Sequence, residues 1–201
     1  MIPADVRPAR VSDVPRLAEI HVAAWRAAYR GIMADEFLDG LDEDRFAANW
    51  TQALSDPDNR VRNFVVVAGD RILGFGGVSA PRDPAEVLDR LPVTADLGQL
   101  AHINLAPEAF GTGVAAVLFT ALEDELRHDG YARAYLMVAE GNDRAMRSTR
   151  SRGGRARRSR TSTTRRTRGA RADVHGRALS LAASAGVWSA DPATDTRLRQ
   201  P

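Results

Sequence analysis

The chain has 201 residues, enough to bury one substantial hydrophobic core, so a single folded domain is the default expectation. It has no cysteine, which excludes a disulfide framework, a thiolate nucleophile and a zinc site with thiolate ligands. No apolar run reaches membrane-spanning length, and the first residues lack a basic segment followed by an apolar one, so we expect a cytoplasmic protein without a membrane partner.

The net charge of +2 combines two segments of opposite sign. Residues 1–147 carry 15 arginines against 23 acidic residues, a net charge of −8, whereas residues 148–201 carry 13 arginines against 3 acidic residues, a net charge of +10. From residue 148 to residue 171 there is no large apolar side chain, so this segment cannot form a core. We therefore expect a folded domain over residues 1–147 and an Arg-rich, disordered tail over residues 148–201.

The first part of the chain predicts a short strand followed by helices. Residues 6–10 can form the strand, and Ser12 is the expected N-cap of a helix with Pro15 in its first turn. Apolar residues then recur at helical spacing through residues 17–28, and residues 37–54 indicate one or two further helices.

A β-hairpin is predicted next. Residues 63–68 and 71–78 flank Gly69 and Asp70, which are turn-forming residues. Glycines at positions 74, 76 and 77 indicate a bulge or a close backbone approach in the second strand. Residues 80–96 predict a loop, with one short helix around residues 85–91.

Residues 98–128 predict a strand, a tight turn and a helix. An apolar run over residues 100–106 meets Pro107 and two glycines, Gly111 and Gly113, after which apolar residues recur at helical spacing. The glycines let the backbone approach a ligand, and the free N–H groups of the new helix favour an anion such as a phosphate. After Gly130, residues 131–139 predict a strand, and a last helix begins near residue 142.

A dinucleotide-binding fold is the first rival interpretation of this turn. Gly111-x-Gly113-x-x-Ala116 fits a permissive form of that fingerprint, and Glu140 follows near the expected place of a ribose-binding acid. We rank it lower because four residues separate the strand from the first glycine, and because no βαβ repeat precedes the unit. A P-loop is excluded, since the pattern Gly-x-x-x-x-Gly-Lys is absent.

The same turn resembles the acyl-CoA-binding motif of the GCN5-related N-acetyltransferases (GNAT family), in which a strand and a proline precede Arg/Gln-x-x-Gly-x-Gly/Ala at the start of a helix. Gly113 and Ala115 occupy the last two motif positions, whereas Phe110 stands where Arg or Gln is usual. Arg-Pro-Ala-Arg at residues 7–10 and Trp-Arg-Ala-Ala-Tyr-Arg-Gly at residues 25–31 also resemble the start of many members. The resemblance implies an α/β fold with a mixed, largely antiparallel central sheet flanked by helices, here with its last strands missing.

The resemblance also implies a function and a set of site residues. The function is acetyl-CoA-dependent transfer of an acetyl group to a primary amine, on a small molecule or a peptide, with acetyl-CoA as co-substrate. In relatives, the first two helices form one wall of the acceptor site, and a homodimer is one open outcome. The implied co-substrate-binding residues are Asn104, Leu105, Phe110, Gly111, Thr112, Gly113, Val114, Ala115 and Asn142, although Asn142 could instead only cap the last helix.

The catalytic groups of relatives are incompletely matched. Many relatives place a glutamate base near the start of the strand that precedes the turn, where this chain has Gln99; His102 is the better candidate base, because its reference pKa is near 6.5. The alternative is a packed histidine without a catalytic role. The usual acid is the tyrosine of a Phe-Tyr-Glu segment for which residues 148–150 offer no phenol, and Tyr131 and Tyr135 lie on another strand. We therefore expect a weak catalyst.

The tail is interpreted as the product of a frameshift after about residue 147. Codons for residues 148–154, read one base early, can encode Phe-Tyr-Glu-Val-Ala-Gly-Trp, which is the continuation that the resemblance implies. Two other functions stay open: a non-catalytic acyl-CoA-binding remnant, and a nucleic-acid binder that uses the Arg-rich tail non-specifically. No metal site is expected.

Overall fold

The computed structural model describes residues 3–89, 91, 96–139, 141–150, 155–158 and 183–189. Its strands are β1 (Asp5–Pro8), β2 (Arg62–Ala68), β3 (Arg71–Ser79), β4 (Leu97–Leu105), β5 (Arg133–Ala139), β6 (Arg155–Arg158) and β7 (Ala183–Ser189). Its helices are α1 (Val14–Tyr29), α2 (Asp35–Asp39), α3 (Glu43–Ser55), α4 (Ala85–Leu88), α5 (Val114–His128) and α6 (Asp143–Arg150), with 3-10 turns η1 (Val11–Asp13) and η2 (Pro107–Ala109).

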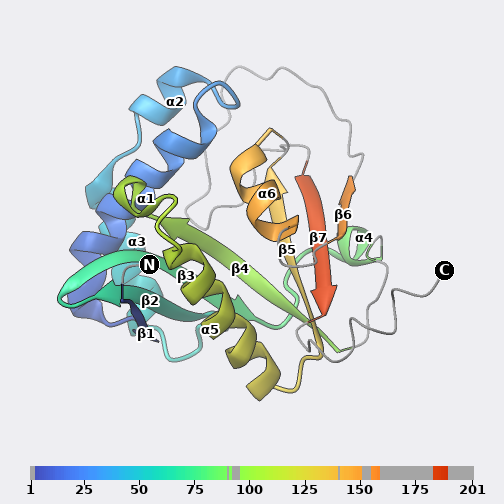
Figure 1. Cartoon of the computed structure of the whole chain (residues 1–201). Helices are drawn as coiled ribbons and strands as arrows, with labels where there is room; N and C mark the ends of the chain where they lie inside the picture. Colours follow the sequence, from blue (N-terminus) through green and yellow to red (C-terminus); the bar gives the residue numbers. More distant parts are fainter. Residues whose placement is uncertain are drawn as a thin grey trace.

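The strands form one sheet in the order β1-β2-β3-β4-β5-β7-β6 (Figure 1). Every neighbouring pair is antiparallel except β4 and β5, which are parallel. The mixed, largely antiparallel sheet predicted from the sequence is therefore confirmed. The dinucleotide-binding alternative is wrong because that fold needs a mostly parallel sheet; its acid, Glu140, lies outside the described residues.

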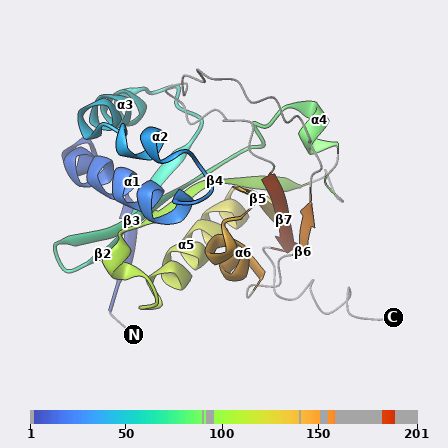
Figure 2. The same ribbon diagram turned by 90° about the horizontal axis from the view of Figure 1, so that it is seen from above.

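Helices cover both faces of the sheet (Figure 2). On one face α5 packs through an apolar stripe at helical spacing, which lies in the larger core cluster with Leu100 and Leu73; the stripe consists of Val114, Leu118, Leu122 and Leu126. On the other face α1 and α3 bury a second cluster that includes Leu17, Trp50 and Phe75. Gly76 of β3 permits close packing of α5, since a Cβ there would lie 2.6 Å from a methyl carbon of Leu122.

The predicted helix start at Ser12 is wrong, because the chain first forms η1 and Asp13 is the N-cap of α1. The Asp13 carboxylate accepts the Arg10 N–H at 2.8 Å and pairs with the Arg7 guanidinium at 2.7 and 2.9 Å. A carboxylate can accept all of these charge-assisted bonds together, which one hydroxyl cannot. The Arg7 hydrogen bonds hold the pKa of Asp13 below its usual value.

The expectation that the sheet would lack its last strands is also wrong, since β7 pairs with β5 and β6 pairs with β7. Residues 183–189 are small or apolar, and β5 would otherwise present a row of unpaired backbone groups. The predicted domain boundary at residue 147 falls within α6, which ends at Arg150. The sequence also predicts that residues 148–201 are disordered, and most of these residues lie outside the described ones.

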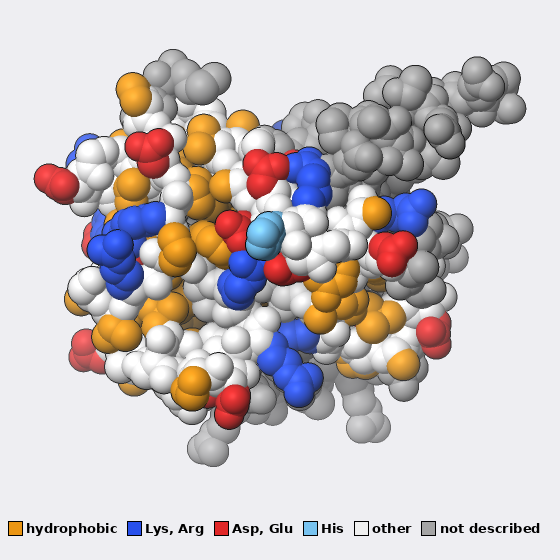
Figure 3. Space-filling view, turned by 90° about the horizontal axis from the view of Figure 1, so that it is seen from below, with side chains coloured by type: hydrophobic (Ala, Val, Ile, Leu, Met, Phe, Trp, Pro, Cys, Tyr) orange, Lys and Arg blue, Asp and Glu red, His pale blue; other side chains and the backbone are white. Residues whose placement is uncertain are grey.

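Charges of both signs are interspersed on the lower face of the molecule (Figure 3). The guanidinium of Arg62 on β2 lies 2.5 Å from Glu125 and 2.6 Å from Asp129, at the end of α5. This face therefore presents mixed rather than uniformly basic charge. Within the described residues, none of the helices is long and apolar enough to cross a membrane.

Candidate active site

Strands β4 and β5 separate partway along their length. Their pairing covers only residues 97–99 of β4 and residues 133–135 of β5, although β4 continues to Leu105. The N–H of Ala106 donates to the Leu73 carbonyl of β3 at 2.9 Å. Because backbone groups alternate in direction along an antiparallel strand, those of Leu105 point away from β3, toward the side on which β5 has diverged. The end of β4 thus offers backbone groups to a ligand.

The turn between β4 and α5 is built around two glycines. Gly111 and Gly113 have φ angles of +75° and +90°, a conformation that residues with a Cβ rarely adopt. The Thr112 hydroxyl donates to the Ala109 carbonyl at 2.7 Å and holds the turn closed. The N–H groups at the start of α5 have no acceptor within the helix, so residues 113–115 can bind an anion.

The start of α6 packs against this turn. The Asn142 side-chain oxygen accepts the N–H of Ala145 at 3.1 Å, so Asn142 caps α6. The guanidinium carbon of Arg144 lies 3.9 Å from the centre of the Phe110 ring. Through this contact, the structure brings Asn142 to the same end of the sheet as residues 104–105 and 110–115. The residues predicted to bind the co-substrate therefore lie at the end of β4, in the turn that follows it and at the start of α6, which contacts that turn.

His102 does not join them. It lies beside Gly77 on the face covered by α1 and α3, with its ring centre 5.7 Å from those of both Trp50 and Phe75. Burial, reinforced by the charge of Arg82, lowers the pKa of His102 to about 4. Its buried Nε2 has no hydrogen-bond partner among the described residues.

A second histidine, His21 of α1, lies in the same aromatic layer. Its ring centre is 4.2 Å from that of Phe46 and 5.5 Å from that of Phe75. Burial, reinforced by the charge of His102, lowers the pKa of His21 to about 3. The two imidazoles are therefore neutral at pH 7, and no pattern in the sequence indicated that they would lie in one aromatic layer.

Gln99, at the position of the base in relatives, has a structural role. It is 6% exposed; its side-chain oxygen accepts the Arg82 N–H at 2.9 Å, and its nitrogen donates to Asp83 at 2.9 Å. The Tyr135 hydroxyl donates to the same Asp83 oxygen at 2.8 Å. Burial and the Asp83 hydrogen bond raise the pKa of Tyr135. Gln99 and Tyr135 thus fasten the loop after β3 and are not free for catalysis.

Tyr29, at the end of α1, is a candidate site residue that the sequence analysis did not propose. Burial raises the pKa of its phenol, whereas a hydrogen bond from the Asn142 side chain lowers it, and the net effect is an increase. Its ring centre lies 5.3 Å from that of Trp25, and the neighbouring Ile32 packs beside Gly141. The four-residue spacing of Trp25 and Tyr29 was the available signal, since it places both on one helix face.

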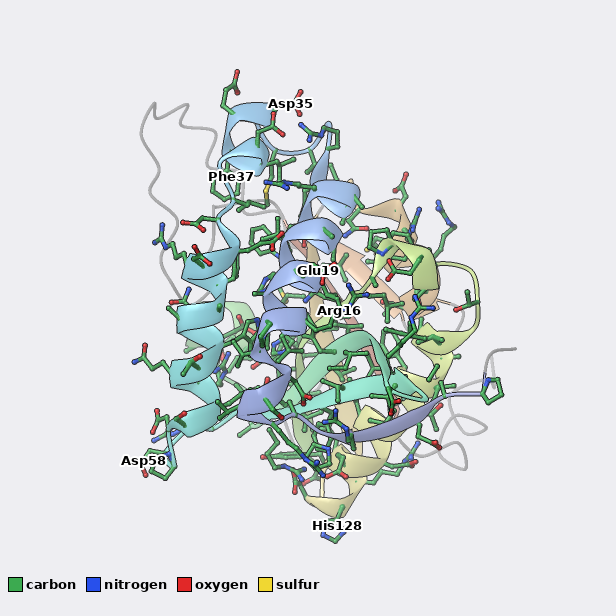
Figure 4. All side chains as sticks on the ribbon, turned by 90° about the vertical axis from the view of Figure 1, so that its left-hand side faces the viewer. Arg16, Glu19, Asp35, Phe37, Asp58 and His128 are labelled. Carbon is green, nitrogen blue, oxygen red and sulfur yellow. The ribbon has the colours of Figure 1, made fainter. Side chains whose placement is uncertain are left out.

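Arg16 lies beside Glu19 on α1 (Figure 4) and links this helix to the turn. Its guanidinium lies 2.6 Å from Glu108 and 2.7 Å from Glu19, and it donates to the Ile72 carbonyl at 3.2 Å. The only acidic residue within residues 106–115 is thus paired with an arginine. Glu108 therefore does not leave an unpaired negative charge beside the proposed anion site.

Comparisons with known proteins agree with this geometry. Residues 14–153 match the model of the acetyltransferase (GNAT) family. The uncharacterized N-acetyltransferase YuaI of Bacillus subtilis is 26% identical over 140 residues, which cover 68% of this chain and 72% of that protein.

Two solved structures share the fold. The PaiA N-acetyltransferase of Thermoplasma acidophilum, in complex with coenzyme A, superimposes with a TM-score of 0.66 at 14% identity, over 93% of this chain and 99% of that one. The YncA structure of Salmonella typhimurium with acetyl-CoA has a TM-score of 0.58 at 16% identity, over 94% and 95% of the two chains.

Proposed function

The chain belongs to the acetyltransferase (GNAT) family, and we propose that it acetylates a primary amine at the place where β4 and β5 diverge. Family membership makes it an N-acetyltransferase with acetyl-CoA as co-substrate. The acceptor amine, the site residues and the activity of this particular chain belong to the proposal.

The observation that carries the proposal is the early end of the pairing between β4 and β5, after Gln99. A linear acyl-CoA arm carries amide groups that can pair with the exposed edge of a strand, as a peptide does. The backbone groups of Leu105, which point away from β3, would pair with this arm, whereas those of the preceding Asn104 face Phe75 of β3. The pyrophosphate would then lie on the N–H groups of the turn that follows, between Phe110 and Ala115, and Asn142 would contact the arm from α6.

In the proposed reaction the amine nitrogen attacks the thioester carbonyl carbon, the carbon–sulfur bond breaks and coenzyme A leaves as a thiolate. The nitrogen loses one proton and the sulfur gains one. His102 is the proposed proton acceptor, because it is neutral at pH 7 and faces α1 and α3, the proposed wall of the acceptor site. With a pKa of about 4 it would hold the proton only briefly.

Tyr29 is the proposed proton donor to the thiolate. Asn142 uses its oxygen to cap α6, so its NH₂ group faces the Tyr29 oxygen. The phenol therefore keeps its own proton for another acceptor, next to a residue proposed to contact the CoA arm. Tyr29 would replace the phenol that residues 148–150 lack.

The test is acetyl-CoA turnover with a panel of amines, followed by a chromogenic thiol reagent. The chain has no cysteine, so every thiol detected belongs to released coenzyme A. Amine-dependent thiol release, with acetylated product identified by mass, supports the proposal. Saturable binding of acetyl-CoA without turnover for any amine would favour a non-catalytic remnant, and absence of binding would contradict both.

The division into residues 1–147 and an Arg-rich tail, and the origin of that tail in a frameshift, also remain proposals. Rewriting residues 148–201 in the early frame is expected to raise both thermal stability and turnover, and an unchanged protein would contradict the frameshift. A role in nucleic-acid binding would require a steep salt-dependent affinity for DNA that is lost when residues 148–201 are removed.

A further inference from the structure

The phosphate-binding turn has a neutral residue at one of its motif positions. Where the family motif has Arg or Gln, this chain has Phe110, whose phenyl ring carries no charge and donates no hydrogen bond. The turn itself supplies only backbone N–H groups, although the co-substrate's pyrophosphate is anionic. A cationic side chain from elsewhere in the fold can supply the missing contact to the pyrophosphate.

Arg144 lies at the required place. It belongs to the first turn of α6, 34 positions after Phe110 in the chain, yet its guanidinium carbon is 3.9 Å from the centre of the Phe110 ring. That distance is well within the range of a cation–π contact. Phe110 therefore serves as a flat support that holds the guanidinium beside Gly111, where the proposed pyrophosphate site begins.

The charge of Arg144 is also available. The side chain is exposed and makes no ion pair with any residue that the structure describes. Glu108, at the start of the turn, forms its ion pair with Arg16 instead, at 2.6 Å. A guanidinium carries donors on its edge while its face stacks, so Arg144 can remain on the ring and still donate to a phosphate.

We propose that Arg144 replaces the missing motif side chain and binds the pyrophosphate of acetyl-CoA, with Phe110 as its support. This inference rests on the proposed co-substrate site but not on catalysis by the chain. A chain that binds CoA through Arg144 and transfers no acetyl group would satisfy it.

The test is the dissociation constant of CoA for the full chain, measured by calorimetry at two salt concentrations. Arg144→Gln is expected to weaken CoA binding roughly tenfold and to reduce its salt dependence, because one charge-assisted contact is lost. Binding of pantetheine, which has no phosphate, is expected to stay unchanged. The CoA affinity of Arg144→Lys should lie between those of the wild type and Arg144→Gln, since lysine keeps the charge but loses the planar donor pair.

A matched control and a rescue decide the outcome. Arg147→Gln removes the same charge from an exposed residue of α6 and is expected to leave CoA binding within about twofold. Adding Phe110→Arg to the Arg144→Gln variant restores the motif residue and is expected to restore affinity. Equal weakening by the two glutamine variants, or equal loss of pantetheine and CoA binding, would overturn the assignment of Arg144 while leaving the proposed acetyl transfer open.

Discussion

The side chain of Asn142 hydrogen-bonds the hydroxyl of Tyr29, which joins the last turn of α1 to the cap of α6. The two residues are 113 positions apart in the chain. The contact places a phenol with a raised pKa next to the residue proposed to hold the CoA arm, on which the proposed proton transfer depends.

The first prediction concerns that phenol. Tyr29→Phe keeps the ring against Trp25 and removes the proton, so kcat should fall roughly tenfold or more, as expected for loss of a general acid. The dissociation constant of CoA should change by less than about twofold. Tyr131→Phe, which removes a phenol packed against the larger core cluster, is the control. Full turnover by Tyr29→Phe would rule out its role as the acid.

The second prediction concerns the left-handed turn. Gly111→Ala and Gly69→Ala both place a Cβ in open space at positive φ, +75° and +58° respectively, so each should cost about 1–2 kcal/mol of stability. Only Gly111 belongs to the proposed pyrophosphate site. Calorimetry should therefore show several-fold weaker CoA binding for Gly111→Ala alone. Similar affinities for the two variants would separate the turn from co-substrate binding.

The third prediction is that the base of relatives cannot be restored by Gln99→Glu. The new carboxylate would lie at the position of an amide nitrogen that now donates to Asp83 at 2.9 Å, in a buried site. Two like charges at that distance should destabilise the fold by about 2–3 kcal/mol at pH 7. Urea unfolding measures the loss, and adding Asp83→Asn should recover most of it. A stable, more active Gln99→Glu enzyme would contradict this account.

The fourth prediction is an acid-sensitive stability that originates in the two buried histidines. The pKa values of His21 and His102 are lowered by burial to about 3 and about 4, from about 6.5 in the unfolded chain. The unfolded state therefore binds more protons below pH 6.5, and stability must fall as the pH falls. Between pH 6.5 and 5, each ring should cost about 2 kcal/mol.

Urea midpoints measured across that pH range test the slope. His21→Asn and His102→Gln should each flatten it, whereas His128→Asn, at an exposed position at the end of α5, should not. A wild-type stability that is constant from pH 7 to pH 5 would show that the rings do not stay neutral in the folded protein.

Local sequence patterns anticipated most elements of the fold. The hairpin flanking Gly69 and the stripe from Val114 to Leu126 followed from alternation and helical spacing, because those periods decide which side chains share a face. The predicted N-cap of α1, Ser12, was wrong by one position, since η1 precedes the helix and the Asp13 carboxylate is held by Arg7 and by the N–H of Arg10. The strand over residues 183–189 was missed, because the residues of β5 that pair with it lie 44 to 56 positions earlier in the chain.

The sequence by itself determined the strand-turn-helix unit, its positive-φ glycines and the N–H groups that it presents, because backbone geometry there depends on neighbouring residues. The tertiary structure decided which side chains meet that unit. It placed His102 on the face of the sheet covered by α1 and α3, paired Gln99 with Asp83, and brought Tyr29 and Arg144 to the proposed site from helices distant in sequence. Such contacts depend on how α1 and α6 pack against the sheet, and no local period in the sequence records that packing.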